Sequence, residues 1–172
     1  MDIFELLMMG VEVSIALAGF AGIIATFQFT GSENINRGRV GALTVIVQFS
    51  LFPALACSLA LCLKTFEVSG EQLWVVCSWF GAAIYSYAMY GTAKAMRGAL
   101  TTTASRMIFV VLQGVGVLII GLNVFNALGI VFQNEPGPYI VGVLYGLAVA
   151  SFMFARLLLR PLWRAVRLQE GG

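Results

Sequence analysis

The feature that most constrains the fold is a series of five long apolar segments separated by short polar links. The segments cover about residues 11–29, 40–63, 72–93, 107–131 and 139–159. A helix needs about 20 apolar residues to cross the hydrocarbon core of a bilayer. Because lipid offers no hydrogen bonds to the backbone, each crossing segment has to be helical. The sequence therefore predicts an all-α, polytopic integral membrane protein, with residues 1–172 forming a single transmembrane helical bundle.

The composition agrees with a membrane protein and excludes several other classes. Hydrophobic residues make up 60% of the chain and charged residues only 10%. A soluble domain carries roughly a quarter charged residues, so this chain has too little polar surface for solution. The net charge of +2 is too small to indicate binding to nucleic acid. We expect membrane lipids, and no nucleic acid, among its partners.

The basic residues fall unevenly on the links between the segments. With five crossings, the first and third links and the C-terminal tail share one side of the membrane. Nine of the ten Lys and Arg residues lie on that side, namely Arg37, Arg39, Lys94, Arg97, Arg106, Arg156, Arg160, Arg164 and Arg167. Only Lys64 lies on the other side. Basic residues concentrate on the cytoplasmic side of membrane proteins, so we expect the N-terminus outside, the C-terminus in the cytoplasm and the bundle in a bacterial cytoplasmic (inner) membrane.

The first segment has a helical pattern with three distinct faces, although its start is ambiguous between Ile3 and Val11. At 100° per residue, one face carries small residues, a second is partly polar and a third carries bulky apolar residues suited to lipid. The small face holds Ser14, Ala18, Ala21 and Ala25, and the partly polar face holds Glu12, Ala16, Gly19 and Thr26. Small residues let helices approach closely in lipid. We therefore expect this helix to lie at the centre of the bundle, with Ser14, Ala18 and Gly19 at packing contacts.

The other segments carry further packing signals. Gly142, Gly146 and Ala150 are spaced by four in the fifth segment, which is typical of a close helix-packing face. Pro53 near the middle of the second segment predicts a kink, because proline removes a backbone donor. The third segment is rich in aromatic residues, namely Trp74, Trp79, Tyr85, Tyr87 and Tyr90. The aromatic residues at its two ends match the interfacial belts of membrane helices.

Glu12 is the one acidic residue that lies well inside an apolar segment. Intramembrane acids usually face a bundle interior or a wet cavity and are candidates for function. Three interpretations remain open for this carboxylate. It marks the outer interface, it makes a structural hydrogen bond, or it forms a cation or proton site.

Four amide side chains form a second group of candidates. Asn123 and Asn126 share one helical face in the outer half of the fourth segment, at a depth similar to Glu12. Gln48 and Gln113 lie in the inner halves of the second and fourth segments. Hydrogen bonds between helices are the ordinary role of such groups, at about 1 kcal/mol each. The alternative is a polar path with an outer and an inner layer.

The C-terminal residues 160–172 are predicted to form a basic amphipathic tail on the cytoplasmic surface. Arg156, Arg160, Arg164 and Arg167 fall within about 80° of one another if a helix continues through or restarts at Pro161. Such a face suits anionic lipid headgroups. Anchoring of the topology and docking of a partner are alternative roles.

The residue inventory argues against catalysis. The chain has no His, and its three Cys lack CxxC spacing, so we expect no metal site, no cofactor and no catalytic residue. Two functions stay open. The first is a homo-oligomeric channel or permeation subunit with Glu12 in a polar outer layer. The second is an accessory or scaffold subunit of a larger membrane complex, and the two differ in whether the chain associates with itself or with another membrane protein.

Overall fold

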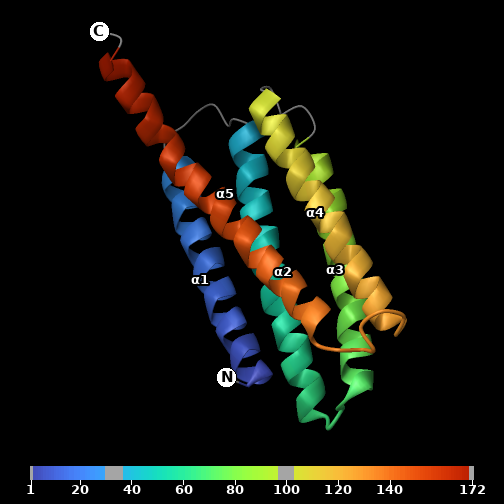
Figure 1. Cartoon of the computed structure of the whole chain (residues 1–172). Helices are drawn as coiled ribbons and strands as arrows, with labels where there is room; N and C mark the ends of the chain where they lie inside the picture. The colour runs from blue at the N-terminus through green and yellow to red at the C-terminus, as the bar shows by residue number, and fades with distance from the viewer. Residues whose placement is uncertain (1, 30–36, 97–102, 171–172) are drawn as a thin grey trace.

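The computed structural model describes the backbone of residues 2–29, 37–96 and 103–170, and most side chains within 2–26, 40–96 and 103–159. In these ranges the chain forms five α-helices, shown in Figure 1. They are α1 (Ile3–Phe29), α2 (Arg37–Thr65), α3 (Glu71–Met96), α4 (Thr103–Ala127) and α5 (Gly137–Glu170). All five are long and apolar enough to cross a membrane. The predicted all-helical fold is confirmed.

Successive helices run in opposite directions, so charged residues far apart in the sequence gather at two ends of the bundle (Figure 1). The acidic end is defined by five acidic residues and also carries Lys64. These five are Asp2, Glu5, Glu67, Glu71 and Glu135. The basic end is defined by Lys94, Arg106 and Arg156. The C-terminus lies beyond the basic end.

The helix boundaries follow the predicted segments with two notable differences. α1 begins at Ile3, the earlier of its two candidate starts, and α4 ends at Ala127 rather than at residue 131. Gly129 follows α4 with a φ of +67°. Its N–H bonds the Asn126 carbonyl at 3.0 Å, and the N–H of Ile130 bonds the Phe125 carbonyl at 3.2 Å. This Schellman arrangement ends the helix although the residues that follow are still apolar.

α5 is the longest helix and continues through Pro161 to Glu170. The expected continuation of the helix into the tail is therefore present in the backbone. The side chains of Arg160, Arg164 and Arg167 lie outside the described residues. Their expected contact with lipid headgroups stays a prediction.

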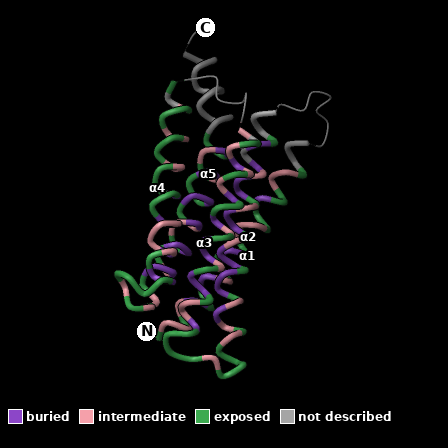
Figure 2. The backbone as a smooth tube through the Cα atoms, turned by 90° about the vertical axis from the view of Figure 1, so that its right-hand side faces the viewer, coloured by how far each residue is buried: buried purple, intermediate pink, exposed green. Residues whose placement is uncertain are grey.

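α2, not α1, lies at the centre of the bundle. α2 packs against α1, α3 and α5. Half of the residues in the most apolar stretch of α2 are buried, compared with 22% in the corresponding stretch of α1. α1 lies at one edge of the bundle and rests on α2 and α5 (Figure 1). α4 lies at another edge, where few of its described positions are buried (Figure 2). The expectation of a central α1 was wrong, because α1 packs against its neighbours α2 and α5 through one face, and its opposite face is exposed.

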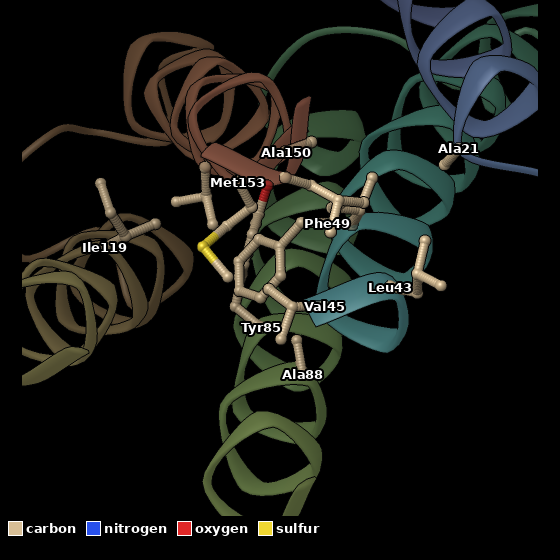
Figure 3. Close-up of a cluster of buried hydrophobic side chains, with 12 residues drawn as sticks. Ala21, Leu43, Val45, Phe49, Tyr85, Ala88, Ile119, Ala150 and Met153 are labelled. Carbon is tan, nitrogen blue, oxygen red and sulfur yellow. The ribbon is translucent and has the colours of Figure 1, made fainter. Parts of the chain in front are cut away.

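The interior is filled by bulky side chains from several helices. Tyr85 of α3, Phe49 of α2 and Met153 of α5 point toward one another in the larger buried cluster (Figure 3). Leu7 of α1 and Tyr139 of α5 belong to a second buried cluster near the acidic end. These contacts close the centre of the described bundle.

The predicted small-residue ladder of α5 packs inside the chain. Gly142, Gly146 and Ala150 are all buried. A Cβ atom at Gly146 would lie 2.6 Å from Cγ of Pro53 and 2.8 Å from the hydroxyl oxygen of Tyr85. The absence of a side chain at Gly146 thus lets α5 cross α2 at the proline.

The packing residues expected on α1 divide into two groups. Ser14 is completely buried and donates a hydrogen bond to the Gly10 carbonyl at 2.6 Å, while Ala18 is half-buried. Gly19 is exposed, and no atom lies within 4 Å of the place where its Cβ would be. Gly19 therefore makes no packing contact within the described chain, because it belongs to the face of α1 that points away from α2.

Candidate functional site

Glu12 lies well inside the membrane-spanning part of α1. The Nζ of Lys64 is 3.4 Å from the centre of the Phe4 ring, and that ring stacks on Trp74 with 6.4 Å between centroids. A layer of aromatic and basic side chains is typical of the membrane interface. Glu12 follows Phe4 by eight residues, which is about 12 Å along the helix. Since half of the hydrocarbon core is about 15 Å, Glu12 lies near the middle of the bilayer when this layer is at the interface.

The Glu12 side chain is exposed on the outward face of α1. Ala16 and Gly19 follow it on the same face and are also exposed. Beyond them Gly22 is equally uncovered, with no atom within 4 Å of its Cβ position. No donor among the described residues bonds the Glu12 carboxylate. The carboxylate thus lies beside the small residues Ala16 and Gly19 and among exposed apolar side chains such as Ile15 and Ile23, with no partner among the described residues.

A bare carboxylate in this position has few stable surroundings. An ionised residue at the centre of a bilayer costs about 2.5–3.5 kcal/mol or more. The cost falls when the group is covered by another helix, reached by water or bound to a cation or proton. Among the described residues there is no group of three or more His, Cys, Asp or Glu side chains that would form a metal site. Glu12 on its own suits transient contact with a cation or proton.

Asn126 connects three parts of the structure near the acidic end. Its amide nitrogen donates to the Ser78 hydroxyl of α3 at 2.8 Å and to the Glu135 carbonyl at 2.9 Å. Its amide oxygen accepts from the Glu135 N–H at 3.1 Å. These bonds join α4 to α3 and to the link before α5. This geometry favours the structural role that was one of the two alternatives for the asparagines.

Asn123 is also completely buried and faces the neighbouring helices. Its amide nitrogen donates to the Ile119 carbonyl at 2.9 Å and to the Pro138 carbonyl at 3.4 Å. Its oxygen has no hydrogen-bond partner and would lie 3.0 Å from a Cβ at Gly81. The missing side chain at Gly81 makes room for this amide between α3 and α4.

The predicted outer layer of Glu12, Asn123 and Asn126 is not assembled within one chain. Glu12 is on α1 and the asparagines are on α4, and the described residues of these two helices make no contact. Glu12 is exposed, whereas both asparagines are 0% exposed. A continuous polar layer at this depth therefore does not form inside the bundle.

The two glutamines of the predicted inner layer both face α3 but at different places. The Gln48 amide nitrogen would lie 3.1 Å from a Cβ at Gly91, and its oxygen has no partner. Gln113 donates to the Met89 carbonyl at 3.3 Å and lines a cleft toward the basic end. Gln48 is not part of that cleft lining. The glutamines thus share a neighbouring helix without forming a single site.

Three tyrosines carry polar contacts that the sequence analysis missed. Tyr85 is 2% exposed, and its hydroxyl donates to the Gly142 carbonyl. The hydroxyls of Tyr139 and Tyr145 donate to the carbonyls of Ala56 and Leu112, each at 2.6 Å. Each bond joins two helices. The available signal for Tyr85 and Tyr145 was their position inside their apolar segments, whereas Tyr139 is the first residue of its segment and carried no such signal.

Arg156 is the one residue of the predicted basic face whose side chain the structure describes. It is half-buried, and its guanidinium donates to the Ser105 hydroxyl of α4 at 2.8 Å. The three cysteines at positions 57, 62 and 77 are unpaired thiols.

Comparisons of the chain with protein-family models, curated proteins and solved structures give no match.

Proposed function

We propose that the protein is a homo-oligomeric membrane channel or permeation subunit in which Glu12 lines a cation path between copies of the chain. The observation that carries this proposal is the exposed carboxylate near the middle of α1, about 12 Å from the aromatic layer at Phe4. A carboxylate in lipid is unfavourable. Association that surrounds Glu12 with water, and lets cations bind between the carboxylates of neighbouring copies, lowers this cost.

The shape of the bundle supports a path between copies rather than through one copy. Tyr85, Phe49 and Met153 fill the larger cluster, and Leu7 and Tyr139 fill the smaller one. The outward face of α1 is free for a second copy. Ala16 and Gly19 on this face would let two α1 helices approach closely, because small residues permit backbone contact in membranes.

The orientation proposed from the sequence fits a cation path. Nine of the ten Lys and Arg residues lie toward one side, so this side is cytoplasmic in a bacterial inner membrane. The acidic end then faces outward. Its five carboxylates together raise the local concentration of cations at the entrance, and each single charge contributes only a small part that salt screens.

The orientation predicts which engineered cysteines react in intact cells. Cys62 is exposed near the acidic end and is first replaced by Ser, while Cys57 and Cys77 are buried. In this background, Ser69→Cys is expected to react with a membrane-impermeant maleimide, and Thr103→Cys only after permeabilisation. Both positions are exposed at opposite ends of the bundle. The reverse pattern would overturn the proposed orientation.

The decisive variant for the cation path is Glu12→Gln, which keeps the size of the side chain and removes its charge. After reconstitution in vesicles, we expect cation flux to fall about tenfold, the change that 1.4 kcal/mol of lost stabilisation produces. Because Glu12 is exposed, the variant should fold and assemble as the parent does.

The matched control is Glu5→Gln, which removes a charge from the same helix at the acidic end. Glu5 is exposed and accepts a hydrogen bond from the backbone N–H of Asp2 at 3.1 Å. Its loss should change flux less than twofold, in line with a surface charge that salt screens. Equal flux in the parent and in Glu12→Gln would contradict the cation path. Purification with unlike chains instead of identical copies would favour an accessory subunit of a larger complex.

A further inference from the structure

α4 and α5 diverge toward the basic end, and a cleft lies between them. The two helices are joined near the acidic end by the link of residues 128–136, and their separation grows toward the basic end (Figure 1). The cleft is shallow and open on one side, and residues of α2 and α3 form its floor. It is distinct from the outward face of α1 that carries Glu12.

The mouth of the cleft is polar and positively charged. Arg156 of α5 and Ser105 of α4 line it and are hydrogen-bonded to each other at 2.8 Å. These two residues lie within a few positions of the ends of their membrane-spanning windows. With these spans across a bilayer, the guanidinium lies near the boundary between the hydrocarbon core and the headgroups.

Thr92 of α3 adds an unpartnered hydroxyl to the same cleft. Its side chain is only 6% exposed, and its hydroxyl has no hydrogen-bond partner among the described residues. A buried hydroxyl without a partner is unfavourable. Because Thr92 lines the cleft, an acceptor atom that enters the cleft satisfies it.

The deeper part of the cleft is apolar. Phe49, Leu112, Val149 and Met153 line it, and Gln113 marks its inner end. Gln113 follows Ser105 by eight residues, so the lining extends about 12 Å along α4. A positively charged mouth above an apolar channel is complementary to an anionic headgroup above a hydrocarbon chain.

We propose that this cleft binds one anionic phospholipid of the leaflet at the basic end. The phosphate pairs with Arg156, the Thr92 hydroxyl donates to a phosphate or ester oxygen, and one acyl chain lies against the half-buried side chains of Ile108, Phe109 and Leu112. A small anion would meet the charge at the mouth but leave the apolar lining empty. This lipid site goes beyond the cation path at Glu12 and does not depend on it.

The test is native mass spectrometry of the full chain in detergent with phosphatidylglycerol or phosphatidylcholine added at equal concentration. We expect phosphatidylglycerol to be retained at about one molecule per chain, and phosphatidylcholine to be lost. Arg156→Gln should weaken retention about tenfold, because it removes the charge-assisted contact to the phosphate. Arg106→Gln is the matched control, since Arg106 is exposed at the same end but does not line the cleft.

Thr92→Val is a second variant that keeps the volume of the side chain and removes only the hydroxyl. Its retention of phosphatidylglycerol should fall about fivefold, as expected for one lost hydrogen bond, and its melting temperature without added lipid should not fall. Glycerol phosphate, the soluble headgroup, should not displace the lipid. Equal retention of the two lipids, an equal loss in Arg106→Gln and Arg156→Gln, or displacement by glycerol phosphate would each overturn the lipid site.

Discussion

Gly146→Ala is expected to lower the free energy of unfolding by about 2–3 kcal/mol, because added atoms in a tightly packed interior force the surroundings apart. The new Cβ would lie 2.6 Å from Cγ of Pro53, and a proline ring has little freedom to move. It would also lie 2.8 Å from the hydroxyl oxygen of Tyr85, which donates to the Gly142 carbonyl. The variant thus disturbs both the α2–α5 crossing and a hydrogen bond between α3 and α5.

The measurement is unfolding by SDS in mixed micelles, with two glycines as controls. Gly121→Ala adds the same atom to α4 where nothing lies within 4 Å, so no loss of stability is expected. Gly142→Ala is expected to cause an intermediate loss of stability, because a Cβ at this position would lie 3.3 to 3.4 Å from the nearest side-chain atoms. If the three variants unfold alike, the close crossing at Pro53 is not present in the folded protein.

The five helices were predictable because hydropathy and backbone hydrogen bonding act together in lipid. A long apolar segment in a bilayer has one satisfactory backbone conformation, the helix, and a helix forms over each of the five predicted segments. The end of α4 was missed because the apolar residues continue past Ala127. The positive φ of Gly129 stops the helix there, and hydropathy carries no information on backbone angles.

The arrangement of the helices was less predictable than their number. A small-residue face indicates that a helix packs closely, but not how many neighbours it has. Ser14 is buried as expected, yet α1 lies at the edge of the bundle. In α5 the same kind of signal was more informative, because Gly146 meets a proline whose position in α2 the sequence also marked.

The hydrogen-bond partners of the candidate site residues could not be predicted from one segment at a time. Asn123 and Asn126 were correctly placed on one face of a helix. Their partners include Ser78 and the carbonyls of Glu135 and Pro138, which become neighbours only through the packing of α4 on α3 and the link to α5. Depth alone grouped the asparagines with Glu12, although α1 and α4 lie apart in the described bundle.

Asn126→Leu is expected to destabilise the bundle by about 2–3 kcal/mol, because it removes several hydrogen bonds at once and leaves buried partners unsatisfied. The leucine keeps the number and branching of the side-chain heavy atoms, so the variant removes the amide without creating a cavity. It deprives the Ser78 hydroxyl and the Glu135 carbonyl of their donor. The measurement is again SDS unfolding in mixed micelles.

Gln113→Leu is the control variant, because it also removes an amide side chain from α4 but breaks fewer hydrogen bonds than Asn126→Leu. Gln113 makes one hydrogen bond, to the Met89 carbonyl at 3.3 Å, so its replacement should cost less than about 1 kcal/mol. A hydrogen–deuterium exchange experiment adds a local readout. In Asn126→Leu the amide of Glu135, which donates to the Asn126 oxygen at 3.1 Å, should exchange faster, while amides of α2 near Pro53 should not change. If both variants cost the same and the exchange at Glu135 is unaltered, Asn126 does not join α4 to the link before α5.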